Sequence, residues 1–349
     1  MAHRYYQRFF ASTSKASQPA KVVATAFRVP VTAKKDKAAS QVDAAMKANN
    51  LVGSVAVIRA GKLTYLASRG QSKYPSGAKN TSATRYQIGS AQDLITAASV
   101  MRLKQAGKLS LSDKLSKYYP KVTNAKHITI SQLLNMTSGL STYATAPKTN
   151  SFPTLLTWNE NNAVSTSTGS CDYQAINYVL LAGIIQKVSG QPYREFIQAQ
   201  LIDKLDLKQT GFVLDDAQRN KLATSYEDSY SGGKVAVTGM AKLQSTKLGP
   251  YQMYMSAKDL ATSYLYILSG KMISKSNLDK LIGHTQSKFS GGVYPEDGDI
   301  LVHGQLGGYQ DSIQINPDKK NGVILLTNYV PTGIKNTDTA PIIYNKVFK

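Results

Sequence analysis

The sequence predicts an α+β fold, in which one sheet is built from both ends of the chain and a helical lobe is inserted between its strands. Apolar and alternating stretches typical of strands lie near residues 51–67 and again near residues 300–327. The residues between them carry mainly helical periodicity and no internal repeat. With 349 residues, the chain is long enough for one two-lobed unit or for two domains.

Each element is expected in turn from its local pattern. An apolar face that includes Val42 and Met46 predicts the first helix, and Ala60-Gly61 predicts a hairpin turn between two apolar runs. The expected elements are, in chain order, a helix at 40–49, strands at 51–59 and 63–67, a polar loop at 70–84, a short strand at 85–87, a mostly helical stretch at 90–140, a loop at 141–170, helices at 173–189, 192–204 and 256–270, strands near 300–303, 309–315 and 321–327, and a helix at about 336–347. A loop as long as 141–170 inside a compact unit is often functional.

The charge of the chain favours a polyanionic partner. There are 42 Lys and Arg against 21 Asp and Glu, which gives a net charge of +21. Such a balance suits nucleic acid, an acidic membrane surface or an anionic cell-wall polymer. The basic residues are scattered, and the sequence has neither zinc-finger spacing nor a phosphate-binding glycine loop followed by Lys and Ser or Thr. Nucleic acid is therefore not expected as a partner.

The first 39 residues differ in composition from the rest. They are rich in Ser, Ala, Lys and Thr, and they are expected to form a basic flexible segment. Residues 1–10 carry basic side chains without the apolar core of a complete signal peptide. The sequence has no run of eighteen apolar residues that would predict a membrane span. Its one cysteine, Cys171, allows no disulfide within the chain and is taken as an incidental small residue.

The most informative stretch is residues 86–97, where Ser90 stands between a short expected strand and the start of a helix. A serine at that position commonly caps the helix, because its oxygen accepts a free backbone N–H. It also lies in the positive field of a helix N-terminus, which stabilises a developing oxyanion. Both roles remain open from this stretch alone.

An ordered set of motifs favours a catalytic role for Ser90 over helix capping alone. Tyr86-Gln-Ile-Gly-Ser90 is followed by Thr137-Ser-Gly-Leu140, and further similar segments follow at 107–111, 128–134, 178–185, 203–212, 256–260 and 316–328. Over residues 40–345 the chain resembles the penicillin-recognising serine hydrolases, in the branch with carboxypeptidases, larger β-lactamases and related esterases. The resemblance implies a β-lactamase/transpeptidase-like fold, with an antiparallel sheet and flanking helices packed on an all-helical lobe. The implied sheet lobe is 40–88 with 250–349, and the implied helical lobe is 89–249.

The resemblance also implies a role for each site residue. Ser90 matches the nucleophile that attacks an acyl carbon, but Asp93 stands where the family has a proton-relaying lysine. Tyr173 matches the tyrosine of the family's Tyr-x-Asn motif, and Ala175 replaces its asparagine. The alternatives are that Tyr173 is a core aromatic residue, and that Asp93 pairs with a lysine or caps the helix.

The third motif aligns best as Val302-His303-Gly304, where Val302 replaces the usual cation. In that register the backbone N–H of Gln305 would be the second oxyanion donor, beside that of Ser90. A register shifted by one residue would start the motif at His303, so the position of His303 stays ambiguous. The four histidines are dispersed without metal-ligand spacing, and neither a metal nor another cofactor is expected.

An aspartate of ordinary pKa, about 3.9, is a poor proton acceptor at neutral pH. Loss of a positioned base commonly costs on the order of a hundred- to ten-thousand-fold in rate. Burial that raises the pKa of Asp93 would offset part of this loss, as would proton transfer to Tyr173. Weak or absent acyl transfer is therefore expected with D-alanyl peptides and β-lactams.

The lead hypothesis is an extracellular cell-envelope protein of the serine hydrolase fold, catalytically impaired, which binds D-alanylated peptidoglycan or teichoic acid. The alternative is an active esterase or carboxypeptidase that uses Ser90 to remove D-alanine from those polymers. The expected partner is a cell-wall polymer, with an acidic membrane surface as the second class that the charge favours. The sequence predicts no oligomeric state.

Overall fold

The computed structural model describes residues 37–349 except 167, 230–232 and 284–287. The expected basic segment 1–39 therefore lies almost wholly outside the described residues. Its last three residues belong instead to the first helix, α1 (Lys37–Ala48), which starts three residues earlier than expected. No helix in the described part of the chain has the length and apolarity needed to cross a membrane.

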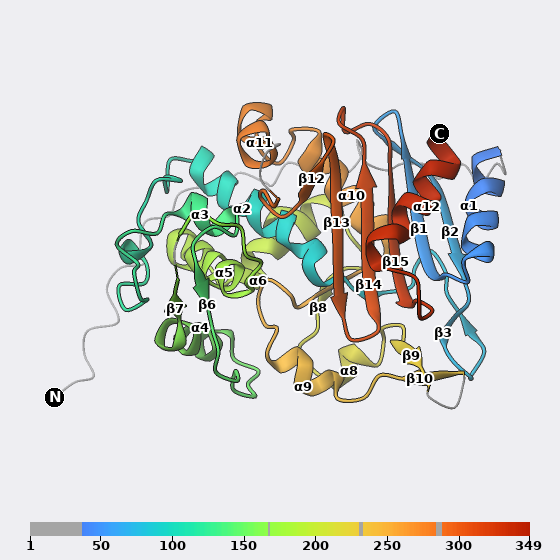
Figure 1. The fold of residues 1–349 in the computed structure, drawn as a ribbon, viewed down its shortest axis with the longest axis horizontal. Coiled ribbons are helices and arrows are strands. Elements are labelled where there is room, and N and C mark those ends of the chain that lie inside the picture. Colours follow the sequence, from blue (N-terminus) through green and yellow to red (C-terminus); the bar gives the residue numbers. More distant parts are fainter. Residues whose placement is uncertain (1–36, 167, 230–232, 284–287) are drawn as a thin grey trace, which may run out of the picture.

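A six-stranded antiparallel sheet organises the molecule, with strand order β12-β13-β14-β15-β1-β2 (Figure 1). Its strands are β1 (Val52–Arg59), β2 (Lys62–Arg69), β12 (Tyr294–Glu296), β13 (Asp299–Leu306), β14 (Tyr309–Ile315) and β15 (Gly322–Tyr329). Strand β1 pairs with β15, so the two ends of the described chain form one sheet, as the sequence predicted. The α+β architecture is confirmed.

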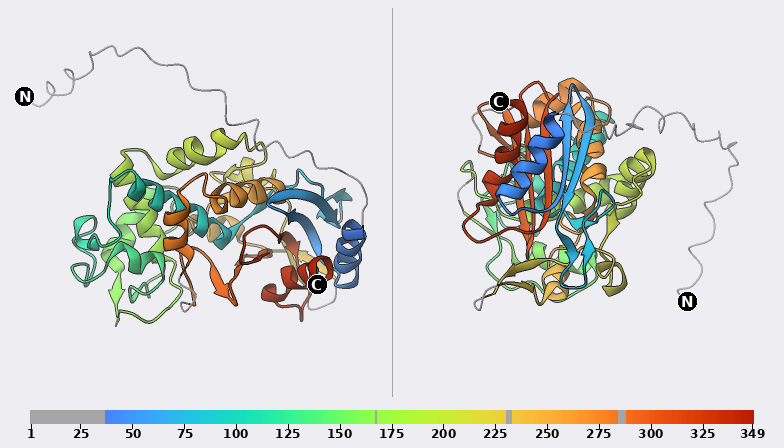
Figure 2. Two further views of the ribbon diagram at one scale, coloured as in Figure 1. Left: turned by 90° about the horizontal axis from the view of Figure 1, so that it is seen from above. Right: turned by 90° about the vertical axis from the view of Figure 1, so that its right-hand side faces the viewer.

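Helices cover both faces of this sheet, which explains why its central strands are mainly apolar and almost wholly buried. All eight residues of β15 are buried, and so are seven of the eight in β1. One face packs on α1 and α12 (Asn336–Phe348), and the other on α10 (Ala257–Leu268). The view from above shows α1 and α12 on one side of the strands and α10 on the other (Figure 2).

The helical part surrounds α2 (Gln92–Gln105), in which eleven of fourteen residues are buried. The other helices between α2 and α10 are α3 (Ile130–Leu134), α4 (Phe152–Asn162), α5 (Ile176–Ser189), α6 (Tyr193–Ile197), α7 (Asp203–Leu205), α8 (Asp216–Arg219) and α9 (Met240–Ser245). A π-helical turn, Gln198–Ile202, joins α6 to α7. The division into lobes at 89 and 250 stays a prediction.

Several elements differ from the expected pattern. The stretch 90–140 is only partly helical, because turns and a short 3-10 helix, Leu115–Lys117, separate α2 from α3. The expected loop 141–170 contains α4, which begins where the Ser151 side chain accepts a hydrogen bond from the Thr154 N–H. Helix α11 (Lys275–Ile282) was not expected at all.

Short strands complete the fold around the main sheet. They are β3 (Gln71–Lys73), β4 (Ala78–Lys79), β5 (Tyr86–Gln87), β6 (Leu140–Ser141), β7 (Val164–Ser165), β8 (Gly211–Phe212), β9 (Tyr226–Asp228), β10 (Lys234–Ala236) and β11 (Met253–Met255). Strands β3 and β4 lie within the stretch expected as a polar loop. Strand β11 pairs with β5 and β8, and this small sheet fixes the chain that leads into α2.

Gly53 offers a test of how closely β1 approaches β15. A Cβ atom at this position would lie 2.1 Å from the Leu326 carbonyl oxygen and 2.7 Å from the Thr327 Cα, both backbone atoms. We expect Gly53→Ala to lower the free energy of unfolding by roughly 1–3 kcal/mol or more, because backbone must move to admit the methyl group. Urea denaturation measures the change. Gly61→Ala, in a turn with nothing within 4 Å of its Cβ position, meets only the backbone strain of a φ of +71° and should cost less, and equal losses in the two variants would contradict the close approach.

Candidate active site

Ser90 lies in a short 3-10 helix, Gly89–Ala91, between β5 and α2. Gly89 has a φ of +42°, which turns the chain sharply before the serine and favours a residue without a side chain. Ser90 is partly exposed, and its side chain does not cap α2, since Ala91 occupies the N-cap position and no side-chain cap bond is present there. The capping interpretation is therefore wrong, and the serine hydroxyl is directed to Tyr173.

Ser90, Tyr173 and Asp93 form a chain of three oxygen atoms. The Tyr173 hydroxyl lies 3.0 Å from the Ser90 Oγ and 2.7 Å from the Asp93 Oδ2. Tyr173 comes from the loop before α5, whereas Asp93 belongs to the first turn of α2 and stands one helical turn after Ser90. The hydroxyl of Tyr251 approaches Tyr173 at 3.4 Å. The structure thus brings together the three residues that were expected to carry the chemistry.

The direction of this chain depends on whether Asp93 holds a proton. The Tyr173 hydroxyl has one hydrogen, so it donates to one neighbour and accepts from the other. With Asp93 ionised, Tyr173 donates to the carboxylate and Ser90 donates to Tyr173, which prepares the serine to lose its proton. With Asp93 neutral, the carboxyl donates to Tyr173 and Tyr173 donates to Ser90, which leaves the serine without a base.

Burial favours the neutral form of Asp93. Its side chain has no exposed surface, and in the described part of the chain its Oδ1 has no hydrogen-bond partner. Burial raises the pKa of Asp93 well above the usual range, and the nearby Asp311 adds to this effect. The hydrogen bond from Tyr173 acts in the opposite direction but is smaller than the effect of burial. The shift therefore favours the protonated carboxyl over the carboxylate.

Lys247 is the cation whose field lowers the pKa of Asp93. It lies between α9 and β11, and its Nζ is 5.7 Å from the centre of the Tyr251 ring. Burial lowers the pKa of Lys247, while Asp93 acts to raise it. A positive charge is thus present near the site, but it comes from a different segment than the family's motif lysine.

Gly304 brings strand β13 against the backbone of Ser90. A Cβ atom on Gly304 would lie 2.9 Å from the Ser90 nitrogen and 2.6 Å from the Asp311 Oδ1, so a larger residue would not fit. Asp311 pairs with Gly304 across β13 and β14 and is buried. Burial raises the pKa of Asp311 to about 8, although backbone hydrogen bonds from Ala91 and from its own amide lower it. A second buried carboxyl therefore lies beside the serine amide.

The other residues of the expected third motif line β13 in alternation. Val302 is buried, His303 is half-buried and Gln305 is exposed. The ring of His303 stacks on Tyr294 with centres 4.2 Å apart, and burial lowers the pKa of His303. A Cβ on Gly89 would lie 3.9 Å from the Gln305 nitrogen, so the amides of Ser90 and Gln305 are on neighbouring segments. Their use as an oxyanion hole stays a prediction.

Ala175 is the N-cap residue just before α5, is partly exposed, and makes no side-chain hydrogen bond. The nearby Asn177 does not replace the missing motif amide, because it is buried and accepts a hydrogen bond from Ser138. Cys171 is a half-buried free thiol. Among the described residues, no group of three His, Cys, Asp or Glu side chains is placed to hold a metal ion.

An aromatic wall beside Tyr173 was not anticipated from the sequence. Phe289 packs edge-on against Tyr173 at 5.5 Å and against Tyr294 at 5.1 Å, and Tyr294 in turn stacks on His303. These residues are close to one another in the fold but lie in segments without a motif. Only their aromatic character, in a stretch between α11 and β13, gave any signal.

The raised pKa of Asp311 predicts how stability changes with pH. A carboxyl whose folded-state pKa lies above its unfolded value stabilises the fold most at low pH, and this contribution is lost as pH rises from about 4 through about 8. We expect Asp311→Asn to raise the melting temperature at pH 8 by roughly 3 °C or more and to gain little at pH 4. Calorimetry at both pH values measures the difference. Asp43→Asn, at an exposed position on α1, should change neither value, and a parallel shift of Asp311→Asn at both pH values would contradict the titration.

The chain is similar to several known proteins over most of its length. The PbpX protein of Bacillus subtilis (strain 168) is 26% identical over 85% of this chain and 74% of that protein. A teichoic acid D-alanine hydrolase of Staphylococcus aureus is 26% identical over 75% of this chain, and the match covers 65% of that relative, less than two thirds of its length. The crystal structure of FmtA from Staphylococcus aureus superposes with a TM-score of 0.78, at 25% identity, and covers 90% of each chain.

The Beta-lactamase family model matches residues 38–343, nearly all of the described chain. The predicted β-lactamase/transpeptidase-like fold is confirmed, and so is the resemblance to penicillin-binding and D-alanine-hydrolysing proteins. This chain belongs to the Beta-lactamase family.

Proposed function

We propose that this protein is an extracellular cell-envelope protein that binds D-alanyl esters of a teichoic-acid-type polymer in the Ser90 cleft and hydrolyses them poorly at neutral pH. The observation that carries the proposal is the buried Asp93 at the far end of the Ser90–Tyr173 chain. Its raised pKa keeps a proton where the reaction needs a base. The cleft therefore retains its nucleophile and tyrosine while its proton acceptor is unfavourable.

The choice of a D-alanyl ester over a peptide terminus rests on Val302. In the family, the first position of the third motif is a cation that binds the carboxylate of a penicillin, and here it is a buried valine. A ligand with a free carboxylate would therefore lose its partner. A D-alanyl ester has no free carboxylate, so the replacement of the motif cation by Val302 removes no partner from it. The name of the Staphylococcus aureus relative, teichoic acid D-alanine hydrolase, supports the same ligand class.

The second candidate is an active esterase, and one observation favours it. The Tyr173 hydroxyl is within hydrogen-bond distance of both the Ser90 Oγ and the Asp93 Oδ2. Once Asp93 loses its proton, Tyr173 can accept the serine proton while passing its own to the carboxylate. This relay conserves protons and leaves Ser90 as the nucleophile. Activity that appears only at high pH would belong to this state.

The binding proposal can be separated from simple attraction of charge. Mild base removes D-alanyl esters from teichoic acid, which also removes their ammonium groups and makes the polymer more negative. Recognition of D-alanine predicts weaker binding of the stripped polymer, whereas attraction to a net charge of +21 predicts stronger binding. We expect weaker binding, measured by retention on immobilised lipoteichoic acid at about 0.15 M salt, where charges further apart than roughly 8 Å are screened.

Ala175→Trp, which adds bulk to the cleft beside Tyr173, should abolish the preference for the D-alanylated polymer. Lys47→Gln removes one charge from the exposed surface of α1 and should leave the preference intact. Equal or tighter retention of the stripped polymer by the unchanged chain would refute recognition of D-alanine.

The catalytic part of the proposal predicts a pH dependence. We expect a fluorophosphonate to label Ser90 slowly at about pH 6–7 and faster toward about pH 9, because Asp93 must first lose a proton that burial holds. Intact-mass spectrometry measures the adduct, and Ser90→Ala gives the background. Asp93→Asn should remove the rise with pH, and Asp93→Lys should raise labelling at neutral pH by restoring a proton relay.

Lys247 provides an internal comparison for this profile. Lys247→Met should move the rise in labelling to higher pH, because the cation lowers the pKa of Asp93, while Lys247→Arg should leave it in place. Rapid, pH-independent labelling of the unchanged chain at neutral pH would show that Asp93 does not limit the reaction.

A further inference from the structure

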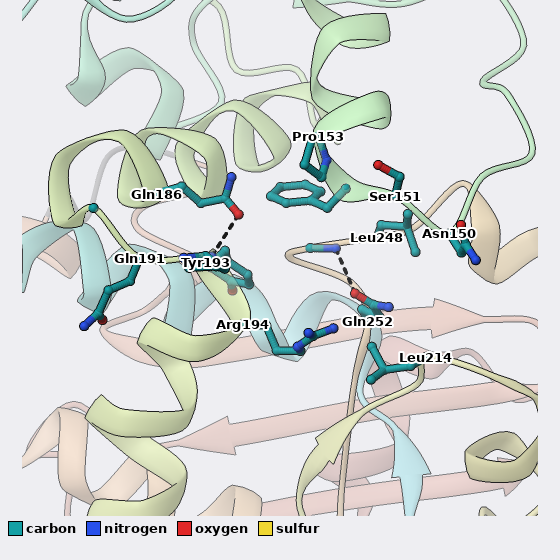
Figure 3. Close-up of a pocket in the computed structure, with 14 residues that line it drawn as sticks. Asn150, Ser151, Pro153, Gln186, Gln191, Tyr193, Arg194, Leu214, Leu248 and Gln252 are labelled. Carbon is teal, nitrogen blue, oxygen red and sulfur yellow. Dashed lines mark hydrogen bonds between the residues drawn. The ribbon is translucent and has the colours of Figure 1, made fainter. Parts of the chain in front are cut away.

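A separate pocket of about 500 Å³ lies between the start of α4, the turn from α5 to α6 and the segment that precedes β11 (Figure 3). Ser90, Asp93 and Tyr173 do not line it. The pocket is half-open, which gives a small molecule access from solvent. Its size is within the range of sites for small ligands, roughly 300–1,000 Å³.

The polar side chains of this pocket are amides, one guanidinium and two hydroxyls. They belong to Asn150, Gln186, Gln191, Gln252, Arg194, Ser151 and Tyr193. Among the residues that line the pocket there is no aspartate or glutamate, and within the described chain Arg194 forms no ion pair. One positive charge therefore faces a pocket without a competing carboxylate, which suits an anion.

Two of the amides are already held in fixed orientations (Figure 3). The Oε1 of Gln186 accepts a hydrogen bond from the Tyr193 N–H at 2.9 Å, which leaves its NH₂ group to donate. Gln252 is held at both ends, since its Oε1 accepts from the Gly249 N–H at 3.3 Å and its Nε2 donates to the Val213 carbonyl at 2.7 Å. Fixed donors and acceptors reduce the entropy lost on binding a hydroxyl-rich ligand.

The wall of the pocket is apolar and rigid. Phe152 contacts the position of Gly249 so closely that a Cβ there would lie 2.4 Å from the ring, and Gly249 has a φ of +78°. Phe152 also packs on Tyr193 at 6.2 Å. The Tyr193 hydroxyl is in turn held by Thr96 and Gln92 of α2. Such a wall provides contact for a carbon skeleton while the amides and Arg194 meet its polar groups.

We propose that this pocket is a second ligand site, which binds a phosphorylated polyol, with the phosphate at Arg194 and a hydroxyl group at the amide of Gln186. The site does not depend on the chemistry of Ser90. It extends the proposed function, because it would hold a polyol phosphate unit apart from any ester in the Ser90 cleft. The probe that matches this chemistry is sn-glycerol 3-phosphate.

Titration calorimetry of the full chain with sn-glycerol 3-phosphate tests the proposal, with glycerol and inorganic phosphate as comparison ligands. We expect glycerol 3-phosphate to bind about tenfold more tightly than either comparison ligand, because only it meets both the guanidinium and the Gln186 amide. Arg194→Gln should weaken its binding by about tenfold. Lys47→Gln on α1, which removes the same charge far from the pocket, should leave it unchanged.

Leu214 allows a matched pair of variants, since it lines the pocket and is 41% exposed. Leu214→Glu places a carboxylate near the phosphate and should weaken binding by about tenfold, while Leu214→Gln has nearly the same shape without the charge and should bind as the unchanged chain does. Equal effects of the two substitutions would overturn the proposed phosphate position. Equal binding of inorganic phosphate and glycerol 3-phosphate would overturn the polyol specificity.

Ser90→Ala and Ala175→Trp separate this pocket from the Ser90 cleft. Both should bind glycerol 3-phosphate as the unchanged chain does. A loss of binding in either variant would assign the ligand to the cleft and overturn the second site. Failure of the D-alanine proposal appears instead in the retention of the stripped polymer, so the two proposals fail in different measurements.

Discussion

The burial of position 93 is the constraint on which the rest of the site depends. Helix α2 lies in the core with eleven of its fourteen residues buried, so the residue one turn after Ser90 cannot reach water. The protonation state of any ionisable group there is therefore set by the surrounding protein atoms. A lysine at that position would bring a positive charge or an amine base, whereas Asp93 brings a carboxyl whose pKa burial raises. If that carboxyl holds its proton, the hydrogen bonds of Tyr173 point in the opposite direction from those around a carboxylate.

The surroundings of Asp93 are consistent with a neutral carboxyl. Tyr173 and Tyr251 supply hydroxyl groups that can donate or accept, and Asp311 adds a second buried acid instead of a compensating cation. Lys247 does bring a cation near the site, but burial lowers its own pKa because desolvation disfavours the charged amine. An ionised pair of Asp93 and Asp311 would oppose the oxyanion that forms on the acyl group. Protonation of both removes this repulsion, but it also removes the base.

The sequence predicted those elements whose local hydrophobic pattern or motif matches their place in the fold. The apolar runs of β1 and β15 match strands covered on both faces, and the motifs around Ser90 and Tyr173 located the two hydroxyls that the fold brings within 3.0 Å. Helix α4 was missed because Ser, Thr, Asn and Pro around Ser151 obscure its weak apolar periodicity, although a serine cap and a first-turn proline begin it. Asp311 was missed because its importance comes from the pairing of β13 with β14, which no local pattern encodes. The capping role of Ser90 was wrong for a related reason, since a tertiary partner takes its hydroxyl.

The chain as a whole is strongly basic, but its site lacks a basic residue at the two motif positions where the family has one. The chain has a net charge of +21, yet the first position of the expected third motif is Val302 and the motif lysine is Asp93. If the cleft selected anions, the excess of basic residues would be expected to supply a cation at one of these two positions. The basic residues instead act at a distance, where attraction to a polyanion depends on summed charge and falls with salt. In the proposed function the cleft discriminates at short range, where a buried valine in place of the motif cation disfavours a ligand carboxylate. The proposed ligand, a polymer with a negative backbone and D-alanyl esters, would satisfy both conditions at once, because its phosphates would meet the basic surface and its esters, which lack a free carboxylate, would meet the cleft.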